Sequence, residues 1–531
     1  MKKLLSIILA AVILSLTVVP AFAAKKCDCG HTPLVVVGGM NGFPLIKDAG
    51  TPNELQVWPP VINYGDVAAT AVLGFSAAAI SRDWNKLGDR LIPVANKLLE
   101  PSSCDADGNS KYPLTTTTFP LSMANYPDFM NSAVKSEEGL LRSACARIGA
   151  DHVYYFNYDW RLDPLEHAKE LDAMIQRVKA ETGHDKVDIT SCSLGGSLTL
   201  AYFHLFGYKD VESCVFLSSA FSGSLAASEI LTGNISIDKN ALKHYIRLNV
   251  NNEYHLDYIL DAFIEVLDQI GSLEQAVNFL NGMLGALKDR VIKEVMLDNL
   301  GTMPGMWSLV REGAYEQAKS ALLSDPKYAK LVKRIDDFHY NVRVNRREII
   351  ENAMHSGVQI YFTSNYEDAL IPAFLSAIKQ SDGLIETVCT STGATVAQLG
   401  EKLPVGYTQA NVCCGKNHIS PDRVVDASTC MFPEQVWFFR GVAHIGTLYG
   451  SEFCDFIFWL LEQPEQVTVW SDASHPQFMA AGDNGMTLHF TTAADGNQKT
   501  VADYVTAVFN VFAQIKQTLA KISAALILAR P

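Results

Sequence analysis

Short apolar runs alternate with helical patterns along much of the chain, and this alternation limits the fold more than any other feature. Leu34 to Val37 is a largely β-branched run that Gly38-Gly39 closes. Runs of similar character follow at 153–156, 186–190, 211–218 and 358–363. Helical patterns lie between them, for example at 165–182 and 195–206. Alternating strands and helices predict an α/β fold, with a mostly parallel sheet covered by helices on both faces.

The pattern becomes helical throughout between about 224 and 350, as in Leu256 to Asn281 and Ala286 to Leu297. We therefore expect a helical insertion, 224–350, between two parts of an α/β core, 25–223 and 351–464. The chain has 531 residues, of which 48% are hydrophobic, so it can bury a core of this size.

Beyond a helical pattern at 452–462, Val467 to Thr492 is strand-like and carries turn signals. From 501 to 530, apolar residues recur at alternating spacings of three and four: Val505, Val508, Phe512, Ile515, Leu519, Ile522 and Leu526. This heptad pattern predicts an amphipathic helix within a C-terminal extension, 465–531. Such a helix could dock on the protein itself, self-associate or contact a membrane surface.

The first 24 residues have the pattern of a signal peptide. Met1-Lys2-Lys3 is followed by an apolar run from Leu4 to about Val19 and by Ala21-Phe22-Ala23, an Ala-x-Ala cleavage pattern. The apolar run has about 16 residues, fewer than the roughly 20 of a membrane span. We expect a secreted or envelope-associated protein. Its net charge of −14 argues against a nucleic-acid partner.

Eleven cysteines in an exported chain suggest some disulfides, with at least one thiol left over. Cys413, Cys414 and Cys430 are the best candidates for a local bridge. Cys27 and Cys29 could form a second bridge or bind a metal. A zinc site would need two more ligands at a recognisable spacing, which the sequence does not offer. We therefore expect no metal and no other cofactor.

Ser193 is the candidate nucleophile. It stands in Ser191-x-Ser193-x-Gly195, between a strand-like run and a helical pattern, and so resembles the G-x-S-x-G elbow of α/β-hydrolases with serine in place of the first glycine. A serine at the start of a helix lies where backbone N–H groups favour developing negative charge. We expect the N–H of Leu194 to be one oxyanion donor and that of Met40, after the run at 34–37, to be the other, with Asn41 as the alternative.

The acid and the base should follow the serine in the chain, in the order Ser, Asp, His. His444, in a loop-like stretch before the helix at 452–462, is the preferred base. His418 competes, but its neighbourhood of cysteines and polar residues is more typical of a surface loop. Asp368 and Asp382 both fit the order as the acid.

Several segments between Pro33 and Leu461 resemble the lecithin:cholesterol acyltransferase and lysosomal phospholipase A2 family. They are Tyr158-Asp159-Trp160-Arg161, the glycine loop 38–45, the stretch 216–224 and Pro304-Gly305-Met306-Trp307. The segment 382–387 is also similar to the one that carries the catalytic acid in many bacterial secreted lipases, which favours Asp382 over Asp368. Ser191, Cys192 and Gly38 depart from the family pattern.

The resemblance implies an α/β-hydrolase fold in which Ser193 attacks an ester carbonyl, His444 moves the proton and Asp382 orients the histidine. Met40 and Leu194 would correspond to the oxyanion hole, and the helical insertion to a cap over an acyl pocket. Trp160 could line the active site with Asn41; alternatively, Asp159 and Arg161 could form an ion pair that ties a strand end to a helix.

We therefore expect an exported serine hydrolase that cleaves or transfers acyl groups of lipids or other carboxylic esters. An amidase, thioesterase or peptidase on the same scaffold is one alternative, because the triad does not choose among acyl groups. A catalytically silent lipid-binding or envelope protein, with 501–531 contacting the envelope, is the other. The sequence does not predict the oligomeric state.

Overall fold

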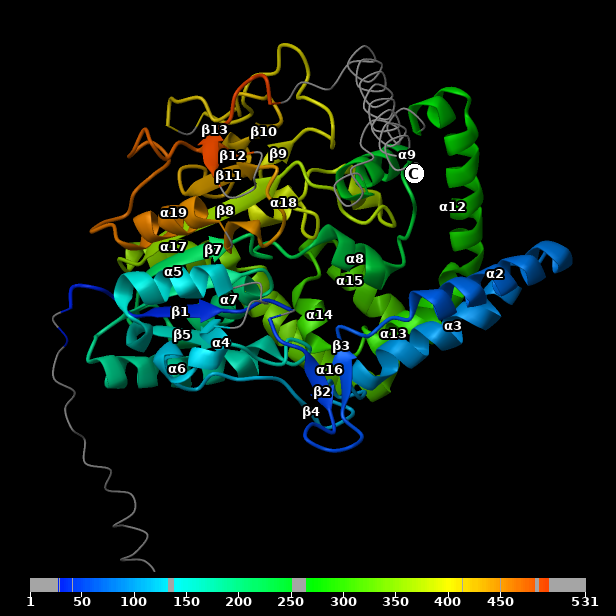
Figure 1. The fold of residues 1–531 in the computed structure, drawn as a ribbon, viewed down its shortest axis with the longest axis horizontal. Helices are drawn as coiled ribbons and strands as arrows, with labels where there is room; N and C mark the ends of the chain where they lie inside the picture. Colours follow the sequence, from blue (N-terminus) through cyan, green and yellow to red (C-terminus); the bar gives the residue numbers. More distant parts are fainter. Residues whose placement is uncertain are drawn as a thin grey trace, which may run out of the picture.

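A computed structural model describes residues 27, 29–40, 42–131, 138–250, 264–412, 414–448, 450–482 and 487–495. Its centre is an eight-stranded sheet of order β13-β12-β11-β8-β7-β6-β1-β5 (Figure 1). Neighbouring strands are parallel throughout, except that β12 and β13 are antiparallel. The prediction of a mixed α/β fold with a mostly parallel sheet is confirmed.

The central strands are buried on both faces, which explains why the sequence shows apolar runs rather than alternation. Their bounds lie close to the predicted runs: β1 Leu34–Val37, β5 Val153–Phe156, β6 Val187–Cys192, β7 Val211–Leu217 and β8 Gln359–Tyr366. The sequence did not predict β11 (Val436–Arg440), which continues the sheet beside β8.

Helices cover both faces of the sheet, and successive residues of β1 point into different layers. Val35 and Val37 pack with α6 (Pro164–Thr182), α7 (Gly195–Phe206) and α17 (Arg346–His355). Leu34 and Val36 pack in the opposite layer, with α5 (Glu138–Ile148) and α19 (Ser451–Leu461). These two apolar layers fix the sheet and the loops at its edges.

The described residues between 224 and 345 contain helices and no strand. The helices are α8 Leu225–Thr232, α9 Lys239–Tyr245, α12 Ser272–Val291, α13 Leu297–Asn299, α14 Pro304–Ser308, α15 Glu312–Leu322 and α16 Ala329–Phe338. The helix expected at 256–281 lies partly outside the described residues. In its described part, Gly271 adopts a left-handed φ of 75° and separates the helical residues 264–269 from α12.

Two further helices join this helical region, although the sequence placed them in the α/β core. They are α2 (Tyr64–Ser81) and α3 (Asn85–Leu99), and Figure 1 shows them beside α12, away from the sheet. Leu87 of α3 and Leu287 of α12 share one small core. A three-stranded sheet connects these helices to the rest: β2 Leu45–Lys47, β3 Leu55–Trp58 and β4 Leu114–Thr115.

The segment after α19 is part of the main sheet rather than a separate extension. β12 (Phe478–Ala481) pairs with β11, and β13 (Leu488–Phe490) forms the sheet edge. The remaining short elements are α4 Pro127–Asn131, α18 Thr387–Thr390, β9 Thr395–Val396 and β10 Val425–Asp426.

The signal peptide expected at 1–24 and the amphipathic helix expected at 501–530 lie outside the described residues. Within the described ranges, no helix combines the length and the apolar character needed to cross a bilayer.

Candidate active site

The loops that carry the predicted catalytic residues meet at one edge of the sheet. Ser193 directly follows β6, Asp382 lies in the loop after β8, and His444 follows β11. Gly38 and Gly39 follow β1. Because these strands are parallel, their carboxyl ends share an edge, which is where open α/β sheets bind ligands.

Ser193 occupies a strained turn between β6 and α7. Its φ is 54°, a left-handed value that is uncommon for a residue with a side chain. Neighbouring backbone holds it there, because its N–H donates to Leu217 O at 3.2 Å and its carbonyl accepts from Ala220 N at 2.9 Å. Strain of this kind persists where the surroundings enforce it, and it is concentrated at functional sites.

Small residues let the backbone close around Ser193. A Cβ on Gly195 would lie 2.8 Å from Val37 O, and one on Gly39 would lie 2.8 Å from the Cβ of Ser193. Gly39, from the loop after β1, therefore lies directly against the candidate nucleophile. Ser191, where the elbow usually has glycine, is accommodated because its Oγ lies 2.6 Å from Thr199 Oγ1 in α7.

His444 and Asp382 form a hydrogen-bonded pair. Nδ1 of His444 lies 2.7 Å from Oδ2 of Asp382, a carboxylate that is only 1% exposed. The other oxygen, Oδ1, accepts from the N–H groups of Leu384 at 3.0 Å and Ile385 at 2.7 Å. Nε2 of His444 is buried and has no hydrogen-bond partner in the described part of the chain. Asp382 therefore orients the ring through Nδ1, and Nε2 of His444 is available to accept or donate a proton.

Asp368, the alternative acid, lies next to this pair, but its carboxylate bonds a backbone N–H group. Its Oδ1 accepts from the N–H of Ala369 at 2.7 Å. Burial, with a smaller contribution from the charge of Asp382, raises the pKa of the Asp368 carboxyl above its ordinary value. The carboxylate in contact with His444 is that of Asp382.

The predicted oxyanion residues flank Ser193. Leu194 is 3% exposed and directly precedes α7. Met40 is half-buried and packs against the apolar layer that contains α6 and α7. Asn41, the alternative donor and a predicted substrate contact, lies outside the described residues.

Trp160 lies in a structural cluster. Arg161 is fully buried, and its Nε donates to Asp159 Oδ1 at 2.9 Å, while its Nη1 donates to Ser102 O at 2.6 Å. Arg161, paired with Asp159, therefore ties the end of β5 to the short 3-10 helix Glu100–Ser102 that follows α3. Trp160 packs against Trp58 with ring centroids 5.0 Å apart, and its indole N–H is buried without a hydrogen-bond partner among the described residues.

His418 is buried, not on a surface loop as its sequence neighbourhood suggested. Its Nδ1 lies 2.8 Å from Gln477 Oε1 and its Nε2 lies 3.1 Å from Cys414 Sγ. Cys414 and Cys430 are both free, so they do not bridge each other as expected. Cys413 lies outside the described residues.

Arg343 supports the Ser193 turn, and no sequence signal indicated it. The side chain is 1% exposed, and it donates to Ser197 Oγ in α7 at 2.8 Å and to Ala220 O at 3.2 Å. It also donates to the carbonyls of Phe221 and Ser308. Burial lowers the pKa of this guanidinium to about 9. A single arginine in a helical pattern gives no hint of these contacts, which require the folded chain.

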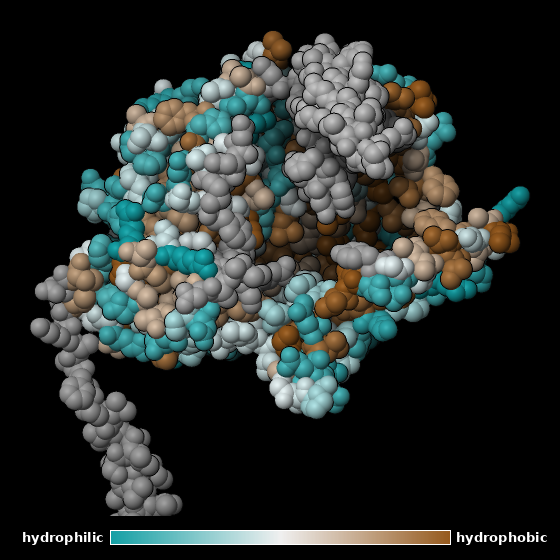
Figure 2. Space-filling model, in the orientation of Figure 1, coloured by the Kyte–Doolittle hydropathy of each residue, from teal (hydrophilic) through white to brown (hydrophobic). Residues whose placement is uncertain are grey.

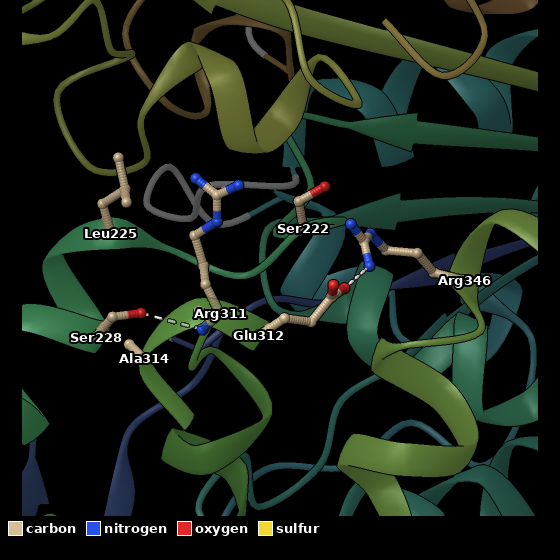
Figure 3. Close-up of a pocket in the computed structure, with 8 residues that line it drawn as sticks. Ser222, Leu225, Ser228, Arg311, Glu312, Ala314 and Arg346 are labelled. Atoms are coloured by element: carbon tan, nitrogen blue, oxygen red, sulfur yellow. Dashed lines mark hydrogen bonds and ion pairs between the residues drawn. The ribbon is translucent and has the colours of Figure 1, made fainter. Parts of the chain in front are cut away.

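A pocket of about 290 Å³ lies among α8, α15 and α17 (Figure 3). Its wall carries the ion pair of Glu312 with Arg346 and a hydrogen bond of 3.0 Å from Arg311 N to Ser228 Oγ. The remaining lining residues are Ser222, Leu225, Gly313 and Ala314. Neither Ser193 nor the Asp382–His444 pair is among these lining residues.

Comparisons with known proteins do not place the chain in a family. No family model and no curated protein matches it. Among solved structures, it is similar to a chain of "The crystal structure of Tle4-Tli4 complex", with 13% identity, a TM-score of 0.25, and coverage of 64% of this chain and 75% of that chain. A likeness at this level supports no functional argument.

Proposed function

We propose that the protein is a serine hydrolase of the α/β-hydrolase fold that acts on acyl esters, with Ser193, His444 and Asp382 as its catalytic triad. The observation that carries this proposal is the pair of His444 and Asp382, bonded at 2.7 Å at the sheet edge where Ser193 sits in a left-handed turn. The order Ser, Asp, His along the chain, after the ends of β6, β8 and β11, agrees with it.

In the proposed reaction, Ser193 Oγ attacks the ester carbonyl while Nε2 of His444 takes the hydroxyl proton. The tetrahedral intermediate collapses, and the alcohol leaves with that proton and leaves an acyl group on Ser193. Water or a second alcohol then gives its proton to His444 and attacks the acyl-enzyme. The second intermediate collapses, Ser193 Oγ takes the proton back from His444, and the acid or a new ester is released. Asp382 orients the ring and stabilises the imidazolium.

The oxyanion of each intermediate needs donors that are already in place. The N–H of Leu194 would supply one, at the start of α7. The N–H of Met40 would supply the other, and the close approach of Gly39 to the Cβ of Ser193 supports this because it brings the loop after β1 to the nucleophile.

An apolar surface on the helical region favours lipid esters as substrates. The 18-residue helix α2 carries only one charged side chain, Asp66. Three of its apolar side chains face solvent: Val72, Leu73 and Ile80 are 64%, 56% and 87% exposed. Figure 2 shows hydrophobic side chains on this helix and along a hollow beside α12. Exposed apolar residues gathered on one region are typical of protein or membrane contact sites. We propose that they approach a lipid surface outside the cell, consistent with the expected export.

The test compares turnover of matched ester, amide and thioester substrates by the wild type and by Ser193→Ala. Ester turnover that is lost in Ser193→Ala, with unchanged circular dichroism and melting temperature, is the expected result. A preference for the amide or the thioester would mean that the protein is an amidase or a thioesterase rather than an esterase. No turnover by folded wild type on any of the three would overturn the proposal in favour of a binding protein.

A further inference from the structure

Four potential metal ligands meet at the opposite edge of the sheet. Cys27, Cys29, His152 and His184 each offer a ligand atom, and these atoms all lie within 4.8 Å of one another. Both cysteines precede β1, His152 immediately precedes β5, and His184 lies shortly before β6. Since β6, β1 and β5 are adjacent and parallel, the fold brings the three strand starts together.

Three sulfur–nitrogen distances in the cluster match a tetrahedral shell. Cys29 Sγ lies 3.5 Å from His184 Nε2 and 3.7 Å from His152 Nε2, and Cys27 Sγ lies 3.7 Å from His152 Nε2. A zinc ion with Zn–S of about 2.3 Å and Zn–N of about 2.05 Å separates tetrahedral S and N ligands by about 3.5 Å. One imidazole nitrogen cannot hydrogen-bond fully with two thiols, whereas a central cation satisfies all four atoms.

The surroundings of the cluster also suit a metal. Asp151 Oδ1 lies 3.1 Å from Nδ1 of His152, on the side of the ring away from the thiols. The two atoms are at ion-pair distance without hydrogen-bond geometry, so the carboxylate contributes a negative charge beside the cluster. The N–H of Cys27 donates to Gly183 O at 3.4 Å, which holds the first ligand segment beside the residue that precedes His184.

We propose that Cys27, Cys29, His152 and His184 bind one zinc ion that fastens the segment before β1 to the starts of β5 and β6. Thiolate and imidazole ligands favour zinc over magnesium or calcium. Four protein ligands leave no open position for substrate, so the role is structural. The six residues of β6 separate this site from Ser193 by roughly 20 Å, and the metal takes no part in the hydrolysis.

The experiment uses the full chain without a histidine tag, purified in the presence of zinc and dialysed. We expect one zinc per chain by elemental analysis, with the metal lost in Cys29→Ser and in His184→Gln. Cys145→Ser and His204→Ala, a half-buried cysteine and an exposed histidine outside the cluster, serve as controls and should keep it. Replacing zinc with Co²⁺ should give the intense thiolate absorption of a tetrahedral cobalt site.

Asp151→Asn separates a metal site from a merely structural cluster, because it leaves all four ligands in place. It should weaken zinc binding modestly, because it removes a negative charge beside His152, and competition with a chromophoric chelator measures the change. Wild type without stoichiometric zinc, or a Cys27–Cys29 disulfide in peptide maps of the untreated protein, would overturn the proposal. Neither result depends on whether the protein hydrolyses esters.

Discussion

The two edges of the central sheet hold two clusters built in contrasting ways. At the carboxyl edge, Ser193 is strained and Nε2 of His444 is left without a partner in the described structure. At the amino edge, Cys27, Cys29, His152 and His184 converge on one another. A strained serine and a histidine nitrogen without a partner are typical of a catalytic site. Four ligand atoms that face one another are typical of a structural metal site. The comparison predicts that activity and stability can be altered separately at the two edges.

The largest expected effect is on the carboxyl edge. Asp382→Asn should reduce kcat/KM by about 10³–10⁴-fold, because an amide holds the histidine in the wrong tautomer and cannot stabilise the imidazolium. Steady-state ester hydrolysis measures the change.

Asp368→Asn is the matched control, since it lies in the same loop region and bonds Ala369 rather than His444. It should retain near wild-type activity. Equal losses in the two variants would mean that the loop as a whole, and not the contact with His444, is responsible.

The second largest effect is expected at the amino edge, on thermal stability. Removing zinc with a chelator should lower Tm by several degrees, because a ligand that binds only the folded state stabilises it. The turnover number at a temperature well below Tm should stay unchanged. Calorimetry and hydrolysis assays on the same sample test this separation, and a parallel loss of turnover would contradict it.

A smaller effect is expected on the apolar helix α2. Val72→Glu should reduce hydrolysis of lipid in vesicles by about tenfold, since a charge on the contact face costs on the order of 1–2 kcal/mol. Hydrolysis of a soluble short-chain ester should not change. Val405→Glu, at another exposed valine, should alter neither activity; if it lowers vesicle hydrolysis as much, α2 is not the contact site.

The smallest effect concerns Asp188, at the start of β6. Burial, with a smaller contribution from Glu212, holds the pKa of this carboxyl well above its usual range. As pH rises above about 4, the unfolded chain ionises while the folded one keeps the proton, so stability falls. Asp188→Asn preserves the acceptor for Ser213 N and cannot ionise. It should be more stable than wild type at pH 7, and the difference should shrink as the pH is lowered towards 4 in urea unfolding. A difference independent of pH would contradict this assignment.

The two clusters also differ in how far the sequence could predict them. Ser193 lies in a local pattern of strand, small residues and helix. The bounds of β1 and β5 agree with their predicted segments because both are continuous apolar runs, and α7 agrees with the predicted helical pattern at 195–206. His152 and His184 lie far from Cys27 and from each other, with no metal-binding spacing, so only the adjacency of β6, β1 and β5 brings them together.

Contacts between distant segments explain the other differences. β11 (Val436–Arg440) was missed because its last three residues fall in the stretch 438–446, which was interpreted as a loop around His444. The association of α2 with α12 depends on packing across about 200 residues of chain, as at Leu87 and Leu287. Arg343 and the buried position of His418 likewise depend on tertiary packing rather than on local pattern.

The central claim is that Ser193 is an activated nucleophile served by His444. The most direct test treats the folded protein with a fluorophosphonate and locates the adduct by peptide mass spectrometry, in the wild type, in His444→Ala and in the exposed-histidine control His204→Ala. The account predicts modification of Ser193 in the wild type and in His204→Ala, and little or none in His444→Ala. An unmodified Ser193 in folded wild type, or equal modification without His444, would contradict it.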